Sequence, residues 1–466
     1  MNRCVIYVCV VMMSMLMPLN THAQEFQGLR TDNFSGSNGM LLNPAGPISG
    51  RLPWDVNVGA FAVNEDNNYI QIPDPMLRFV STTDSIIDVN YYHPKKIYGH
   101  GNVLLQLPSA FMRFDDYAFG MYTTARSAGY FLSDKQTEGI IGIKDLPLYT
   151  EHTMPAFNAG VLVWSEIGLN GEMILESNSL FSIHIGMNLK FLMGFEALGF
   201  ENNEDFVFVK DTVNYNLSAF NTEFDYTRNL GSNLLYDPAN YALNGKGVGL
   251  DIGGYYIIHK KSKFTYSRKL GYTWKFGAAL LDLGAIKFTA NSGSYHLQDT
   301  LPFAVSNLVL DSIDDIDEFN RTGSKTIYDD VDFSKDFSTF SMFLPAALML
   351  SVDKPLGNDF FVQAMIVRRF PRFGTNLIAR SNIVAVTPRY ERRKIGLFMP
   401  MQLYEDKEFR IGGAVRFFFL TVGTDNFRSW TNPEDYASID FYVGVKLTPY
   451  WLVPETKKKF IECLKW

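Results

Sequence analysis

The side chains best suited to bind a ligand are seven arginines that gather over one predicted hairpin in the last third of the chain. A guanidinium offers a planar fork of donors that can hold a carboxylate or phosphate through two hydrogen bonds. Arginines at the end of a strand could instead project away from any ligand, and the sequence leaves both interpretations open. The seven are Arg368, Arg369, Arg372, Arg380, Arg389, Arg392 and Arg393. Among them we take Arg368, Arg380 and Arg389 as candidate ligand-binding residues.

The sequence offers little evidence for catalysis or metal binding. The seven histidines are scattered, and neither G-x-S-x-G nor H-E-x-x-H occurs. Gly245, Gly247 and Gly249 resemble a nucleotide loop only superficially, because no helix follows them to hold a phosphate. The acidic run 311–318 has carboxylates that calcium favours but lacks the glycine and spacing of an EF-hand, so we favour a solvated loop. We therefore expect no enzymatic activity, no metal and no cofactor.

The elements that position these side chains are best seen in the stretch Phe181–Phe195. Its odd positions are all apolar, whereas its even positions are mostly polar or small and include His184 and Lys190. This period of two residues is typical of a β-strand. At ~3.3 Å per residue and a tilt of about 45°, such a strand is long enough to cross a lipid hydrocarbon layer. His184 and Lys190 join the candidate ligand-binding residues because they share the polar face.

A long strand with one apolar face could belong to a soluble sandwich or to a membrane barrel. Aromatic residues make up 15% of the chain, whereas the mean hydropathy is only −0.04. That combination fits a barrel in which only alternate residues meet lipid, and strand-end arginines would then face lipid headgroups. No apolar run is long enough for a membrane-spanning helix after the N-terminus. The net charge of −7 gives no reason to expect a nucleic-acid partner.

The N-terminus predicts export. Arg3 precedes the short apolar run Cys4–Leu16, and Thr21-His22-Ala23 forms a plausible cleavage site, so residues 1–23 are interpreted as a signal peptide. Cleavage would leave Cys463 as the only cysteine, and an internal disulfide would then be impossible. The expected location is the outer membrane of a Gram-negative bacterium.

The rest of the chain predicts roughly 14 antiparallel strands over residues 54–450, followed by a C-terminal tail at 451–466. Short turns are expected near Asp115, Ser177, Gly357 and Asp406, and long polar loops near residues 80, 140, 235, 310 and 430. Bacterial outer-membrane barrels have short turns on the periplasmic side and long loops outside. The expected fold is therefore all-β: a transmembrane antiparallel β-barrel with long extracellular loops.

Residues 24–53 precede the first good strand and are rich in glycine, asparagine and proline, which is typical of turns and not of a long element. The segment is too polar for lipid, so it could enter the barrel lumen as a plug. An ordered periplasmic lead-in is the open alternative. Under the plug hypothesis we expect the gating residues to be Asn38, Gly39, Asn43 and Pro44.

Two sets of residues resemble known outer-membrane proteins. The lead from Gly28-Leu29-Arg30 to Asn43-Pro44-Ala45 resembles the N-terminus of the long-chain fatty-acid transporter (FadL-like) superfamily. Thr387–Tyr390, Gly396–Met401 and Gly412-Gly413 are similar to an uncharacterised outer-membrane family related to it, which occurs in bacteria with type IX secretion. The resemblance implies a 14-stranded barrel with a lumenal N-terminus, but it carries over no substrate.

The sequence therefore predicts a barrel that passively takes up or transfers a hydrophobic or amphipathic small molecule, gated by its N-terminal segment. The alternative is a non-conducting accessory or scaffold barrel that docks with a secretion or outer-membrane assembly machine. The expected partners are outer-membrane lipid, a hydrophobic small-molecule ligand and, in the alternative, proteins of such a machine.

Overall fold

The computed structural model describes most of the chain after the predicted signal peptide. The described residues are 25–68, 70–71, 90–91, 96–133, 147–218, 220–227, 242–259, 271–299, 303–306, 316–370, 376, 378–428 and 438–452. The predicted signal peptide, Cys463 and most of the predicted C-terminal tail lie outside these residues.

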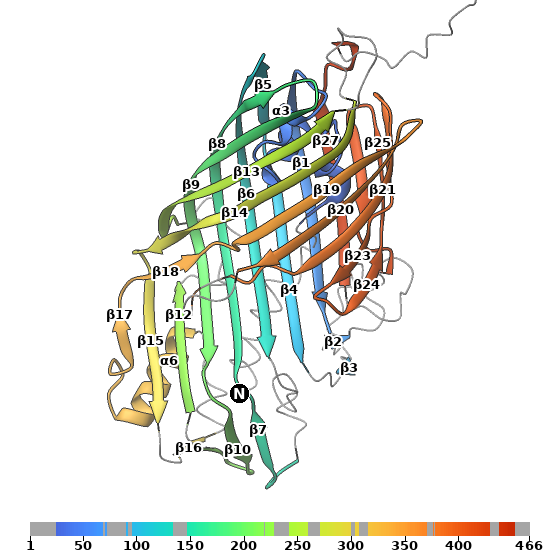
Figure 1. The fold of residues 1–466 in the computed structure, drawn as a ribbon. Helices are drawn as coiled ribbons and strands as arrows, with labels where there is room; N and C mark the ends of the chain where they lie inside the picture. Colours follow the sequence, from blue (N-terminus) through green and yellow to red (C-terminus); the bar gives the residue numbers. More distant parts are fainter. Residues whose placement is uncertain are drawn as a thin grey trace, which may run out of the picture.

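A closed antiparallel barrel of 14 strands forms the body of the molecule (Figure 1), as predicted. Its last strand pairs with its first, so that Val56 lies opposite Leu447. Several positions in the wall are occupied by two or three short strands in line. In order around the barrel the wall consists of β1 (Trp54–Asn67), β4 (Ile97–Gln106) with β5 (Ser109–Phe114), β6 (Tyr117–Ser133), β8 (Phe157–Ser177), β9 (Phe181–Asn202), β12 (Phe220–Thr227) with β13 (Gly245–His259), β14 (Tyr272–Phe288) with β15 (Ser292–Asp299), β17 (Lys335–Phe337) with β18 (Phe340–Phe343) and β19 (Ala347–Gly357), β20 (Phe360–Arg369), β21 (Ile383–Glu391), β22 (Ile395–Phe398) with β23 (Met401–Tyr404), β24 (Glu408–Ile411) with β25 (Gly413–Phe417), β26 (Leu420–Thr424), and β27 (Ser438–Leu447).

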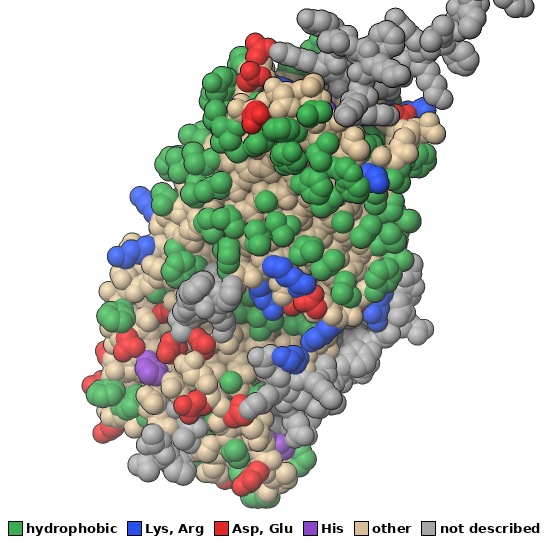
Figure 2. Space-filling model, in the orientation of Figure 1, with side chains coloured by type: hydrophobic (Ala, Val, Ile, Leu, Met, Phe, Trp, Pro, Cys, Tyr) green, Lys and Arg blue, Asp and Glu red, His purple; other side chains and the backbone are tan. Residues whose placement is uncertain are grey.

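The two faces of the wall differ as the alternation in β9 predicts. Ile185 and Phe191 point outward and are 37% and 48% exposed, whereas Asn188 and Lys190 point inward and are buried. Figure 2 shows apolar side chains spread over the outside of the barrel. The outward face of an outer-membrane barrel is apolar in this way because it meets hydrocarbon.

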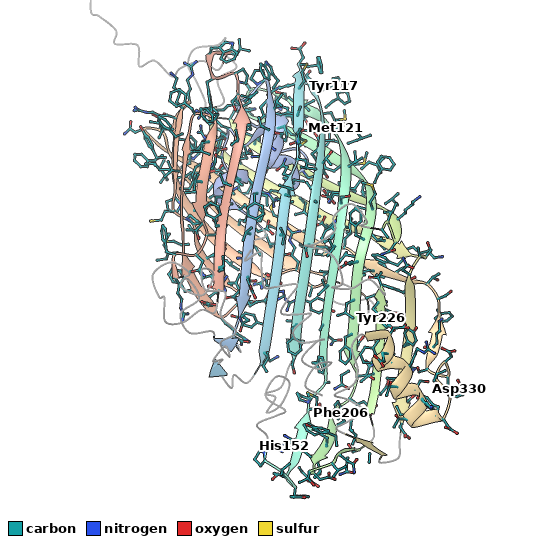
Figure 3. All side chains as sticks on the ribbon, turned by 180° about the vertical axis from the view of Figure 1, so that it is seen from behind. Tyr117, Met121, His152, Phe206, Tyr226 and Asp330 are labelled. Carbon is teal, nitrogen blue, oxygen red and sulfur yellow. The ribbon has the colours of Figure 1, made fainter. Side chains whose placement is uncertain are left out.

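Exposed aromatic side chains gather where the short turns lie. Tyr117 and Met121 project outward there (Figure 3), close to the turn between β5 and β6. Aromatic residues of this kind form girdles at the level of the lipid headgroups in membrane barrels. The exposed aromatic residues close to this set of turns are Phe114, Tyr117, Phe119, Tyr256, Phe360, Phe417, Phe418, Phe419 and Trp451.

The turns and loops sort mostly as expected. The turns at Asp115 and at Asn358-Asp359 are tight, and all three residues have positive φ, which Asp and Asn tolerate better than most residues. The expected placement of the Asp406 turn with them was wrong. Asp406 pairs with Arg368 near the far end of β20, so this turn lies among the long connections. Its length resembles a periplasmic turn, but the order of the strands places it at the other end.

The long connections hold more structure than the sequence indicated. Near the lower end in Figure 1, a four-stranded sheet joins segments from three connections. The helix α6 (Ile316–Tyr328) and the strands β15 and β17 lie in the stretch 289–338, which was expected to be a loop. The strands of the outer sheet are β7 (Glu151–Met154), β10 (Phe206–Lys210), β11 (Asn214–Leu217) and β16 (Phe303–Ser306); a separate small pair is formed by β2 (Ile70–Gln71) and β3 (Asn90–Tyr91).

The N-terminal segment enters the lumen near the short-turn end, as its blue trace shows in Figure 1. It forms only the short helices α2 (Gln27–Arg30), η1 (Gly36–Leu41) and α3 (Gly46–Ser49), and nearly every residue in it is buried. After β27 comes one turn, η3 (Tyr450–Leu452). Among the described helices, none combines the length and apolar character needed to cross a membrane.

Candidate lumenal site

The N-terminal segment docks on a dent in the inner wall at Asn43 and Pro44. Gly186 of β9 and Gly253 of β13 are register partners, and both face this pair of residues. A Cβ atom on Gly253 would lie 2.5 Å from the Asn43 Oδ1, and one on Gly186 would lie 2.5 Å from the Pro44 carbonyl oxygen. Both wall positions therefore need glycine for the segment to approach this closely.

Hydrogen bonds hold the docked residues. The Asn43 amide donates to the backbone oxygens of Gly254 and Ala278, at 3.2 and 3.1 Å. In the opposite direction, the Asn170 amide of β8 donates to the Pro44 oxygen at 2.9 Å. The Asn188 amide donates to the Met40 oxygen at 3.0 Å. The contacts involve polar groups on the four neighbouring strands β8, β9, β13 and β14, so a shift of the segment would break several of them together.

Polar contacts also attach the rest of the segment to other strands. The Arg416 guanidinium bonds the Asp32 carboxylate at 2.8 Å, and the Asn33 amide donates to Glu391 at 2.8 Å. Near α3, the Ile48 backbone N–H donates to Glu172 at 2.7 Å. Gly36 has φ +54°, and a Cβ on it would lie 1.9 Å from Asp55, so glycine is required there as well. These contacts reach strands on different sides of the lumen.

A buried cluster of charges lies beside the segment, centred on Asp282. A bulge in β14 gives Asp282 a φ of 54°, which few non-glycine residues adopt. Its carboxylate accepts hydrogen bonds from Lys190 (2.6 Å), Arg126 (2.8 and 3.0 Å) and Arg380 (3.1 Å). Arg380 also binds Glu25 of the N-terminal segment at 2.6 Å. The cluster thus joins three wall strands and the segment through one carboxylate.

Little free space remains where the cluster meets the segment. The cavity between them has a volume of about 20 Å³ and is lined by Phe26, Arg30 and Leu41 on one side and by charged wall residues on the other. This is about the volume that one water molecule requires. The segment and the charge cluster are therefore closely packed at this level.

The predicted ligand-binding residues lie in different surroundings. Lys190 and Arg380 belong to the Asp282 cluster, and Lys190 also pairs with Asp251 at 2.8 Å. Arg389 is buried between Asp353 and Glu391. His184 faces the lumen and contacts the Ser182 hydroxyl at 3.0 Å. Arg368 lies apart from them, near the loop end of β20.

Each of these four inward side chains already has a partner within the protein. Their role in ligand binding stays a prediction, and it would require exchange of these partners for a ligand. Of the predicted gating residues, Asn43 and Pro44 contact the wall directly. Gly39 supports the segment itself, since its carbonyl accepts from the N–H groups of Leu42 and Asn43. Asn38 is buried within the lumen.

The sequence interpretation missed Asp282 and the two glycines of the dent. Gly186 stands on the polar side of a strand, where a small residue could have indicated a close approach of another segment. The bulge at Asp282 has no comparable sequence signal. Within the described ranges, no group of three or more His, Cys, Asp or Glu side chains is arranged to hold a metal ion.

Residues 44–425 match the model of a family described as a family of unknown function, DUF5723. The chain belongs to this family. The matched range includes Pro44, the two glycines of the dent, and Asp282 with its partners Arg126, Lys190 and Arg380. Comparison of this DUF5723 barrel with curated proteins gives no match.

Several solved structures are similar to this DUF5723 barrel. The toluene transporter TodX of Pseudomonas putida has 11% identity, with 92% of this chain and 96% of that chain covered and a TM-score of 0.39. The toluene transporter TbuX of Ralstonia pickettii has 9% identity, 89% and 92% coverage and a TM-score of 0.38. A FadL homologue of Pseudomonas aeruginosa has 7% identity, 93% and 99% coverage and a TM-score of 0.25. At these TM-scores we base the fold on the strand pairing itself.

Proposed function

We propose that the protein is an outer-membrane channel that its N-terminal segment holds closed, and that it passes a small hydrophobic or amphipathic molecule when the segment moves. The observation that carries the proposal is the docking of residues 25–53 inside the lumen through many separate polar contacts. Each hydrogen bond of this kind contributes only about 0.5–1.5 kcal/mol, because water can replace the partner that is lost. The segment is therefore suited to be displaced without unfolding the barrel.

The location in a membrane is supported by the outward face of the wall. Apolar side chains cover it, and aromatic residues gather near the short turns. By the usual orientation of outer-membrane barrels, the short turns and the N-terminal segment would face the periplasm. The four-stranded outer sheet and α6 would then face the outside of the cell.

The kind of molecule is inferred from the wall that the segment covers. Apolar side chains such as Leu104, Phe398 and Tyr442 pack against Phe26 and Leu29 of the segment. Carboxylates and amides of the wall bind the same segment from nearby positions. Displacement of the segment would expose apolar and polar groups side by side, which suits an amphipathic solute better than an ion.

The second candidate function is the non-conducting accessory barrel. The closed lumen favours it, because at the charge cluster only a cavity of about 20 Å³ remains. The outer sheet gives such a barrel a surface for a partner protein. The link to a secretion or assembly machine, including type IX secretion, rests on the sequence resemblance and stays a prediction.

Solute flux into liposomes distinguishes the two functions. Deletion of Ser35–Pro47 removes η1 and the docked residues, and Gly253→Val fills the dent while keeping the chain length. Both variants are expected to raise the flux of a small amphipathic dye above that of the wild type. Folded barrel content is checked by resistance to SDS at room temperature, so a misfolded variant is recognised.

The matched control is Gly171→Val on the neighbouring strand β8, where an added Cβ would meet nothing within 4 Å. Its flux is expected to equal that of the wild type. If the two plug variants fold and their flux also stays at the wild-type value, the gating proposal is wrong and the accessory function is favoured.

A further inference from the structure

A second feature of the wall lies on its outside, where the surface carries an apolar groove. The groove crosses β9, β13, β14, β19 and β20 and has a volume of about 670 Å³. This lies within the roughly 300–1,000 Å³ of pockets that bind small molecules. Almost all of its surface is apolar, so it offers no partners to water.

The floor of the groove is made of small residues and its sides of large ones. Gly254, Ala278 and Ala364 present little or no side chain to the outside. Around them, the outward side chains of Ile185, Tyr256, Phe276, Leu350 and Ile366 stand higher and are 37–44% exposed. The register aligns Ile185, Gly254, Ala278, Leu350 and Ile366 in one row across the five strands.

A cation lies beyond one side of the groove. Lys354 is two residues after Val352, a lining residue, on the same outward face of β19. Its Nζ lies 4.3 Å from the centroid of the Trp274 ring, which is stacked on Phe276. Among the described residues, Lys354 has no carboxylate partner. A ring therefore holds the ammonium group at the aromatic girdle, and none of the described carboxylates pairs with it.

An apolar groove that leads to such a cation has the chemistry expected of a binding site for an anionic lipid. We propose that the groove is a binding site for one phospholipid, whose acyl chain occupies the groove and whose phosphate pairs with Lys354. Tryptophan at the headgroup level and a lysine beside it are the groups that hold lipid headgroups at an interface. The acyl chain of this lipid would then fill the space that the small residues of the floor leave open.

This inference requires that the barrel stands in a bilayer, but it does not depend on gating by the N-terminal segment. Failure of the flux experiment would therefore leave it intact. Failure of the lipid experiment would equally leave the gating proposal intact, because the groove is separated from the lumen by the wall.

Native mass spectrometry of the full-length mature barrel tests the proposal. The barrel is placed in nanodiscs of equal parts phosphatidylglycerol and phosphatidylcholine, and the lipids that remain bound after release are counted. The wild type is expected to retain one phosphatidylglycerol. Ala278→Phe fills the groove and should lower the retained fraction about tenfold. Lys354→Gln should lower it about fivefold, which corresponds to the loss of about 1 kcal/mol from one lysine near a membrane surface.

Two control variants make comparable substitutions on another part of the wall. Lys394 lies over the Phe418 ring at 4.9 Å, so Lys394→Gln removes a cation in a similar setting. Val415→Phe enlarges an outward side chain of β25 away from the groove. Both controls should retain the lipid. Equal retention in all variants overturns the proposal, as does a dimer in the wild type that Ala278→Phe alone dissociates, since a second copy would then occupy the groove.

Discussion

The inner and outer faces of β9, β13 and β14 share one backbone but are built by different rules. On the outside, Ile185, Leu189 and Ile252 need only be apolar, because hydrocarbon accepts any such side chain. On the inside, Lys190 and Asp251 are bound to named partners at fixed distances. The outer face is thus specified by composition and the inner face by geometry.

Gly254 and Ala278 take part in the contacts of both faces. On the inside, the Asn43 amide binds the backbone oxygens of both residues. On the outside, the same two residues form the floor of the apolar groove. Their backbone oxygens bind the N-terminal segment on the inside, and their small side chains leave room for a lipid chain on the outside.

The largest effect is expected from the inner face, at Asp282. Asp282→Ala would leave Lys190, Arg126 and Arg380 without their shared acceptor in a buried site. Breaking a buried ion pair by removing one partner costs about 3–5 kcal/mol. Urea unfolding in lipid vesicles, followed by tryptophan fluorescence, should show this loss in the free energy of unfolding.

The control for Asp282 is the exposed pair between Arg368 and Asp406. Asp406→Ala removes the same chemical group, but surface ion pairs contribute only about 0–1 kcal/mol. A loss at Asp282 no greater than that at Asp406 would mean that the inner cluster is solvated and contributes little to stability.

A smaller effect is expected when the rule for the outer face is broken. Leu189→Arg places a cation on the lipid side of β9, which costs about 2–4 kcal/mol near the middle of the bilayer and less toward its edges. The same unfolding measurement applies. Val213→Arg serves as control, because Val213 is 56% exposed between β10 and β11 and should change the free energy by less than about 0.5 kcal/mol. Equal losses for both would place the outer face of β9 in water.

This contrast explains how much the sequence could predict. The outward alternation in Phe181–Phe195 is visible in the residue types alone, and from it the barrel and its closed antiparallel form followed. Lys190 was recognised as an inward cation for the same reason, whereas Arg389 was recognised as one of a cluster of arginines over one hairpin. Their partners could not be predicted, because Lys190 and Asp282 are 92 residues apart and meet only through the barrel register.

The misses have physical causes too. The strands β7 and β16 of the outer sheet are only four residues long and lie in connections that are mostly polar, so their periodicity is too short to detect. The bulge at Asp282 adds one residue to β14, and a bulge depends on pairing and not on residue type. The two glycines of the dent could not be linked to the N-terminal segment from the sequence. The segment residues that contact them stand 140 or more residues earlier in the chain.

The smallest effect is expected where the segment meets the wall, at Asn43. Asn43→Ala removes two hydrogen bonds to wall carbonyls, which lowers the docking free energy by about 1–2 kcal/mol. Backbone amides of residues 36–49 should then exchange with deuterium about tenfold faster in peptide-resolved mass spectrometry, whereas amides of β9 should be unchanged. The barrel itself stays folded, so global unfolding should shift little.

Asn178→Ala is the matched control, because the Asn178 side chain also makes two hydrogen bonds to the backbone, accepting from the N–H groups of Leu180 and Phe181 at 2.9 Å, but in a turn outside the lumen. It should leave exchange in residues 36–49 at the wild-type rate. If Asn43→Ala does the same, the segment is held by the ion pairs of Asp32 and Glu25 and not by the dent. Gating would then have to act through charge, and the glycines at 186 and 253 would serve only to give the segment room.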